Sequence, residues 1–472
     1  MGEKSNGLAT QREKLGSRLG FILLSAGCAI GVGNVWKFPY MADQYGGGLF
    51  VLVYLIFLII FGVPIMTMEF SLGRASQKSP AMLYQKLQKP GQKWHIHGYA
   101  AFGGNILLMM FYTSVTAWLL QYFVKTVKGD FIGMAPEQVP AVFGEVVGNP
   151  LMQMLFVSIV VIIGVVVCIF GVKNSLEKVT KFMMVALLAI MVGLAIYSLT
   201  LDGAREGLKF YLVPNFEQIK SFKDVANVIS GALSQAFFTL SLGIGSMAIF
   251  GSYLKKDRAL LGESAMIAGL DTFVALVSGL IIFPACYTFN GGEIQEGAGF
   301  IFSVFPNIFN NIQPQALGTV IGAFFFIFLS FAALSTVFAV FENIFACAQD
   351  LFGWSRKKAS LIMGAVILVL SIPCVLGFNV LDGLTIPKLN WNIMDIEDFI
   401  VSYVMLPLGS LCYVLFCVTN KGWGYDNFLL EANTGKGLKV QKWMKPYLMY
   451  VLPILVVIAA VVSILSKFGI LG

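Results

Sequence analysis

One acidic residue, Asp271, stands deep within an apolar stretch of this sequence. Its neighbours in the run IAGLDTF, residues 267–273, carry no charge. A carboxylate inside a membrane-spanning segment is costly, so it is a candidate functional group by default. Carboxylate oxygens are suitable ligands for a hard cation. The alternative is a protonated side chain that hydrogen-bonds a neighbouring helix.

Two other apolar stretches carry glycine where a continuous helix is expected. The first contains Gly27, Gly31, Gly33 and Asn34, and the second is the run SLGIG at residues 241–245. A single glycine in a membrane most often serves close helix packing. Two clusters, five spans apart, instead indicate two helices that unwind and expose amide donors and carbonyl acceptors to a carboxylate or a cation.

The composition predicts that these residues lie in a membrane. Of the 472 residues, 57% are hydrophobic and 12% are charged, whereas soluble proteins carry about 25% charged residues. This excludes a soluble enzyme, a nucleic-acid binder and a disordered scaffold. Because a span needs about 20 apolar residues, we expect eleven transmembrane helices, at residues 18–42, 47–72, 97–124, 150–171, 179–200, 225–253, 260–289, 317–350, 358–378, 397–418 and 446–466.

The distribution of basic residues predicts the orientation of these helices. Cytoplasmic loops carry an excess of lysine and arginine. With the N-terminus inside, 23 of the 32 basic residues fall on the cytoplasmic side. We therefore expect residues 1–17 to form a cytoplasmic tail. Because the number of spans is odd, the C-terminus should lie outside.

Two further features limit the chemistry. The seven cysteines lack the spacing of a zinc site or a disulfide framework, and the sequence has two histidines, His95 and His97. A membrane metalloenzyme is therefore a poor alternative. We expect both histidines to be ordinary polar residues at the cytoplasmic interface. Glu69, inside the second span, is expected to bind backbone amides near an unwound helix.

The two glycine clusters also predict an internal repeat. Interrupted helices at matching positions in two halves are typical of transporters with an inverted repeat. The two five-helix halves would be residues 18–200 and 225–418, with a peripheral helix at 446–466. The predicted fold is an all-α membrane protein of eleven helices, a 5+5 inverted repeat in which helices 1 and 6 are broken.

Several motifs together resemble the neurotransmitter:sodium symporter family. They are RLGF at 18–21, GVGNVWKFPY at 31–40, GGG at 46–48, GVP at 62–64 followed by Glu69 and GR at 73–74, QAFFTLSLG at 235–243 and GSYL at 251–254. The resemblance covers essentially the whole chain and is closest in kind to bacterial members, many of which lack a twelfth helix. It implies the LeuT-type fold and sodium-coupled transport by alternating access.

The resemblance implies two bound sodium ions and no organic cofactor. The first site is expected to consist of Ala29, Asn34, Thr239 and Asp271, completed by the carboxylate of the substrate. The second is expected to consist of the carbonyl groups of Gly27, Ile30 and Ala332 and the hydroxyl groups of Ser335 and Thr336.

The resemblance also implies an amino-acid site between the broken helices. Its α-carboxylate would meet Val32, Gly33 and Tyr112, and its α-amine would meet Ala29, Phe238, Thr239 and Ser241. Its side chain would face Cys28, Gly31, Leu108, Phe238, Ile244, Thr336 and Val340. Because these residues are uncharged and an unpaired buried charge is costly, we expect a neutral apolar or aromatic L-amino acid.

Two charge pairs are expected to close the ends of the transport pathway. Lys37 and Asp398 would pair at the outer mouth, and Arg12 and Asp350 at the inner mouth beside Tyr253. The family usually has arginine at the first position, and lysine cannot form a bidentate pair. The fifth span departs from the family pattern too, because it lacks a proline that many bacterial members carry there and that lets its inner half unwind.

These features predict a multi-pass protein of a bacterial inner membrane that takes up an amino acid with sodium. It would be a monomer or weak homodimer, without a nucleic-acid partner and without enzyme activity. Chloride should not be required, because Asp271 supplies the charge that chloride supplies in animal relatives. The alternatives are a sodium-conducting channel or a non-transporting amino-acid sensor on the same fold.

Overall fold

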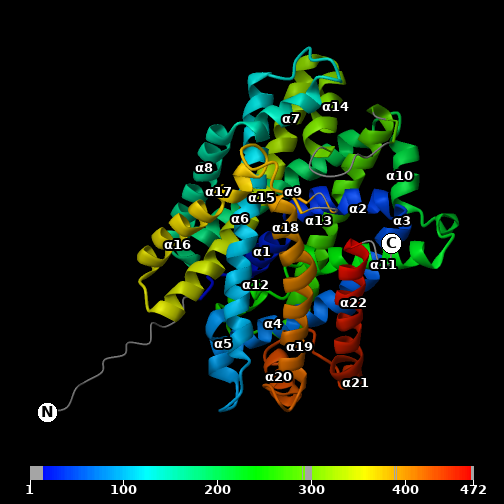
Figure 1. Ribbon diagram of the computed structural model, residues 1–472. Helices are drawn as coiled ribbons and strands as arrows, with labels where there is room; N and C mark the ends of the chain where they lie inside the picture. Colours follow the sequence, from blue (N-terminus) through cyan, green and yellow to red (C-terminus); the bar gives the residue numbers. More distant parts are fainter. Residues whose placement is uncertain (1–13, 290, 293–299, 387–388, 390, 469–472) are drawn as a thin grey trace.

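The computed structural model describes residues 14–289, 291–292, 300–386, 389 and 391–468, which form a bundle of helices (Figure 1). Nine helices in these ranges are long and apolar enough to cross a membrane. They are Gly48–Ser76 (α3 to α4), His95–Lys128 (α6), Pro150–Ile169 (α8), Val172–Ser198 (ending in α9), Leu260–Phe289 (α13), Gln315–Phe352 (α15), Arg356–Leu376 (α16 and α17), Ile393–Val418 (α18 to α19) and Met444–Leu465 (α21 into α22).

Two further spans are interrupted at the glycine clusters. The first consists of α1 (Arg18–Ala29) and the segment Gly33–Gln44, which ends in α2 and is bent by 56° from α1. The second consists of α11 (Phe222–Thr239) and α12 (Ser246–Ser252). By length and composition, the nine helices and the bent pair make ten spans among the described residues, one fewer than the eleven predicted. The helices α11 and α12 lie where the broken sixth span was predicted, and both predicted breaks are confirmed.

The backbone of the second break explains the sequence there. Ser241, Gly243 and Gly245 have positive φ angles of 50°, 95° and 78°. Glycine adopts this conformation without a steric penalty, whereas a residue with a Cβ does so at a cost. The chain therefore leaves the helical path after Thr239 and resumes it at Ser246.

Shorter helices and local distortions complete the chain. The shorter helices include α5 (Pro80–Leu87), α7 (Val139–Gly148), α10 (Ala204–Leu212), α14 (Phe305–Asn311) and α20 (Tyr425–Ala432). Helix starts follow capping residues: the Ser17 hydroxyl accepts the Gly20 amide at α1, and Ser221 with Asp224 forms a capping box at α11. Within the spans, π-helical stretches occur at Leu58–Gly62, Val172–Leu176, Phe399–Met405 and Tyr447–Val451.

The helices α6 and α15 lie at the centre of the bundle. In their most apolar segments 72% and 83% of the residues are buried, compared with 33% in α8 and in Met444–Leu465. The last helix is therefore peripheral, and so is α8. All seven cysteines are free thiols; six are buried, and Cys412 is partly exposed.

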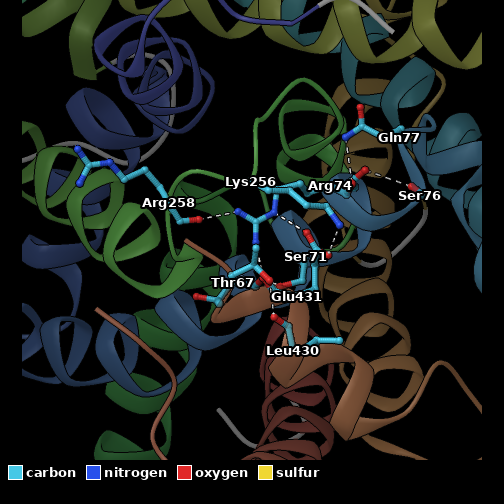
Figure 2. Close-up of polar contacts among 11 residues, drawn as sticks. Thr67, Ser71, Arg74, Ser76, Gln77, Lys256, Arg258, Leu430 and Glu431 are labelled. Atoms are coloured by element: carbon cyan, nitrogen blue, oxygen red, sulfur yellow. Dashed lines mark hydrogen bonds and ion pairs between the residues drawn. The ribbon is translucent and has the colours of Figure 1, made fainter. Parts of the chain in front are cut away.

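A buried ion pair ties α4 (Val63–Ser76) to α20, as Figure 2 shows. The Nε atom of Arg74 lies 2.6 Å from Oε1 of Glu431, and its Nη1 donates to the carbonyl oxygen of Arg258 at 2.6 Å. A second cation, Lys256, lies 3.0 Å from Oε2 of Glu431. The Arg74 side chain is fully buried, while that of Lys256 is 61% exposed. One carboxylate thus joins three segments that are distant in sequence.

Replacing Glu431 with alanine should lower the free energy of unfolding by about 3–5 kcal/mol, because it leaves the charge of Arg74 buried without a carboxylate partner. Lys256→Ala is the matched control and should cost at most about 1 kcal/mol, because that end of the pair is exposed to solvent. Thermal unfolding of the purified protein ranks the two variants. Equal shifts of the midpoint would contradict this account.

Candidate functional site

A small cavity lies where the two broken helices meet. Its volume of about 20 Å³ gives room for about one water molecule. It is lined by Cys28, Ala29, Gly31, Gly33, Leu108, Tyr112, Phe238, Ser241, Ile244, Thr336, Val401 and Leu406. Ten of these twelve residues belong to the predicted substrate site, and none of the twelve is charged.

Three members of the predicted substrate site do not line this cavity. Val32 lies just behind it, where its amide donates to the Tyr112 hydroxyl at 3.1 Å. Thr239 is turned toward Asp271, and Val340 is buried in the core of α15. Sequence reasoning missed Val401 and Leu406. Both lie in an ordinary apolar span, and nothing in the sequence indicated that this span reaches the cavity.

At two glycines of the first break, side chains approach the backbone closely. A Cβ atom at Gly31 would lie 2.5 Å from the Tyr112 hydroxyl and 2.7 Å from Oγ1 of Thr336. A Cβ atom at Gly33 would lie 2.7 Å from Cε1 of Phe238. Larger residues at these two positions would fill the cavity or push its walls apart.

Asp271 is the centre of a buried polar cluster beside the first break. Its Oδ1 accepts the side-chain amide of Asn34 at 2.8 Å, and the Thr239 hydroxyl lies 3.0 and 3.1 Å from its two oxygens. The Tyr54 hydroxyl lies 3.4 Å from Oδ2. Asn34, Thr239 and Asp271 are all at most 1% exposed. The structure therefore brings together the three side chains of the predicted first sodium site, while Ala29, its fourth member, lines the cavity.

The five residues of the predicted second sodium site also meet, between α1 and α15. The Ser335 hydroxyl lies 2.8 Å from the carbonyl oxygen of Ala332 and 3.5 Å from that of Ile30. The Thr336 hydroxyl lies 3.3 Å from the carbonyl oxygen of Gly27. All the oxygen atoms of this cluster are neutral carbonyl or hydroxyl oxygens, the kind of ligand that a hard cation accepts.

The buried Glu69 and the partly buried His97 hold the second break in place. The Gly243 amide donates to Oε1 of Glu69 at 2.6 Å, as predicted for that glutamate. Nε2 of His97 donates to the Gly243 carbonyl oxygen at 3.3 Å, and Nδ1 of His97 accepts the Tyr84 hydroxyl at 2.7 Å. The prediction that His97 is an ordinary interfacial residue is therefore wrong. Its position close to the second break depends on helix packing, which the sequence does not reveal.

Two asparagines that sequence reasoning missed bind the next carbonyl group. The side-chain amide of Asn105 donates to the carbonyl oxygen of Ile244 at 2.8 Å. The amide of Asn343 lies 3.2 Å from Oδ1 of Asn105 and 3.4 Å from the same carbonyl oxygen. Both side chains are at most 1% exposed. The one indication of this role in the sequence is that each asparagine lies within an apolar run.

The predicted outer gate is arranged differently from an ion pair. Among the described residues, the Lys37 ammonium group makes no salt bridge within 4 Å and lies over the Phe238 ring, 4.0 Å from its centroid. Oδ1 of Asp398 accepts the Ser402 hydroxyl at 2.6 Å. The lysine thus contacts an aromatic wall of the cavity through a cation–π interaction.

At the inner end, Arg12 lies outside the described residues. Asp350 accepts the Ser79 amide at 2.7 Å and lies 3.5 Å from the Lys78 ammonium group. The Tyr253 hydroxyl donates to Glu342 at 2.5 Å. The gating roles of both pairs stay predictions.

The start of α1 is anchored at the same end. Glu177 accepts the Gly16 amide and the Ser17 hydroxyl, each at 2.8 Å, and Arg18 pairs with Glu263 at 2.9 Å. The span that contains Glu177 has no proline but begins with the π-helical stretch Val172–Leu176. The fifth span is thus locally distorted at its start, although it contains no proline.

Two interrupted helices around an uncharged cavity, with a buried polar cluster beside it, in a bundle of apolar spans, define a membrane transporter. Known proteins specify the family. The model of the Sodium:neurotransmitter symporter family matches residues 12–132 and 143–469, so the chain belongs to this family. The family consists of sodium-dependent transporters rather than enzymes, so this is a multi-pass transporter with sodium as its coupling ion.

Individual proteins similar to this chain are also sodium-dependent transporters. An uncharacterised sodium-dependent transporter of Bacillus subtilis, YhdH, is 34% identical over 97% of this chain and 98% of its own length. A sodium- and chloride-dependent taurine transporter of Rattus norvegicus is 25% identical over 80% of this chain and 67% of its own length. The crystal structure of MhsT in complex with L-phenylalanine matches with a TM-score of 0.86 and 37% identity, covering 96% of this chain and all of MhsT.

Proposed function

We propose that this protein couples the inward movement of two sodium ions to the uptake of a neutral apolar or aromatic L-amino acid, by alternating access and without chloride. The observation that carries the proposal is the arrangement of the Asp271 cluster beside an uncharged cavity between two broken helices. The predicted roles of the sodium, substrate and gate residues are part of this proposal.

The cavity supports a zwitterionic substrate with an apolar side chain. Backbone groups and hydroxyls at the breaks, together with Tyr112, suit the α-amine and α-carboxylate, and a sodium ion beside Asp271 would complete the carboxylate site. Leu108, Phe238 and Ile244 provide an apolar wall. MhsT, a structural neighbour, was crystallised with L-phenylalanine. The volume of about 20 Å³ requires the walls to move apart when an amino acid enters.

The proposal also covers the setting of the transporter. We infer a cell membrane, a cytoplasmic N-terminus, an external C-terminus, a monomer or weak homodimer, and two five-helix repeats over residues 18–200 and 225–418. Cross-linking and labelling of loops on either side would test the orientation. A channel would conduct sodium without saturable uptake, and a sensor would bind the amino acid without counterflow.

Asp271→Ala should abolish sodium-dependent amino-acid binding, because it removes the only charged side chain of the proposed first sodium site. Equilibrium binding of a labelled amino acid, with and without sodium, measures this. Asp382→Ala, at an exposed loop position, is the control and should bind normally. Normal sodium-dependent binding by a folded Asp271→Ala protein would rule out the assigned role.

The substrate class follows from the uncharged walls of the cavity. In displacement assays, leucine, phenylalanine, tyrosine and tryptophan should bind at least about tenfold more tightly than aspartate and lysine, a difference of about 1.4 kcal/mol. A charged side chain would be buried without a partner. A preference for charged amino acids, or for glycine alone, would contradict the proposed class.

Transport should be equally fast in chloride and in gluconate. Tyr54, Gln235 and Thr239 match part of a chloride site in animal relatives, but Tyr54 and Thr239 lie within hydrogen-bond distance of the Asp271 carboxylate. Two anions a few ångströms apart in a low dielectric repel each other by about several kcal/mol. Uptake into sodium-energised vesicles measures the effect. Asp271→Asn should make transport chloride-dependent, and a large loss on chloride removal in the unaltered protein would refute the proposal.

A further inference from the structure

The span Ile393–Val418 contributes two side chains to the cavity although it contains neither break. Val401 and Leu406 are both apolar and are 0% and 2% exposed. The neighbouring Leu408, on the same span, is 46% exposed. One face of this span therefore forms a wall of the cavity while another faces outward.

A local distortion places Val401 and Leu406 on the same wall. Residues five apart in an α-helix point about 140° away from each other, since each turn takes 3.6 residues. The stretch Phe399–Met405 is π-helical, and i→i+5 hydrogen bonding brings residues five apart close to one face. A regular helix over the same residues would turn one of the two side chains away from the cavity.

The same span supports the second break through backbone contacts. A Cβ atom at Gly243 would lie 2.1 Å from the carbonyl oxygen of Leu406, and a Cβ atom at Gly409 would lie 2.1 Å from the carbonyl oxygen of Gly243. No layer of side chains separates the two backbones there. The position of Ile244 in the cavity is thus set by this span on one side and by Asn105 on the other.

The other parts of the cavity wall tolerate fewer changes in side-chain size. Gly31 and Gly33 are in close contact with Tyr112 and Phe238. The carbonyl of Ile244 is held by hydrogen bonds. Val401 and Leu406 present only aliphatic carbon to the cavity, so their size changes its volume without removing a polar contact.

We propose that Val401 and Leu406 determine the size of the amino-acid side chain that this transporter accepts. The inference rests on the proposed function, because it assigns a role within the same amino-acid site. Shortening either residue enlarges the space available beside Ile244, and lengthening either residue reduces it.

The test is competition binding to the purified full-length protein in sodium, with leucine and tryptophan as the probes. Leu406→Ala and Val401→Ala should each raise the affinity for tryptophan relative to leucine. For Leu406→Ala the ratio should change at least about tenfold, the lower limit for a change in apolar pocket size. Leu406→Phe should change the ratio in the opposite direction. Leu408→Ala removes the same atoms from the outward face and should leave the ratio unchanged.

The outcomes separate the inference from the function on which it rests. Failure of the unaltered protein to bind any amino acid would refute the proposed function. If the unaltered protein binds amino acids, an unchanged ratio in the folded alanine variants would overturn the role of this wall. Equal losses for leucine and tryptophan would likewise overturn it, because they indicate a structural effect rather than size selection. If Leu406→Ala does not fold, Val401→Ala decides the question by the same criteria.

Discussion

Inside a bilayer every backbone amide and carbonyl group needs a hydrogen-bond partner from the protein or from trapped water, because lipid offers none. A continuous helix satisfies its own groups, but a broken helix does not. Glu69 and His97 bind the amide and carbonyl of Gly243, and Asn105 binds the carbonyl of Ile244. These polar side chains at the centre of the bundle thus provide the hydrogen bonds that the broken helix lacks. The apolar spans around it keep water away from these groups.

The first break is satisfied in the same way. The side-chain amide of Gln235 donates to the carbonyl oxygen of Gly33 at 3.0 Å, and the Ser278 hydroxyl donates to that of Asn34 at 2.7 Å. These contacts join helices from both predicted repeats around one point. In the proposed function an ion beside Asp271 and an amino acid in the cavity would stabilise the same packed arrangement. Each would then favour binding of the other, which is the thermodynamic basis of coupling.

The features that could be predicted from the sequence are those with a local signal. Clustered glycines in an apolar run indicate a break, and a carboxylate in such a run indicates a polar site; Asp271 lies in one. The roles of His97 and Leu406 had no such signal, because each depends on which helices become neighbours. The ion pair of Arg74 with Glu431 joins residues 357 positions apart. Neither residue alone differs from an ordinary charge at the end of a helix.

The distribution of cysteines has a practical consequence. Six of the seven thiols are buried, and a buried thiol away from cationic groups reacts slowly because the thiolate is the nucleophile. Cys28 is the one thiol on the cavity wall. A small polar alkylating reagent would reach it only while the cavity is open to water. The rate at which the Cys28 thiol is alkylated therefore reports how often the cavity opens to water, and no engineered cysteine is needed.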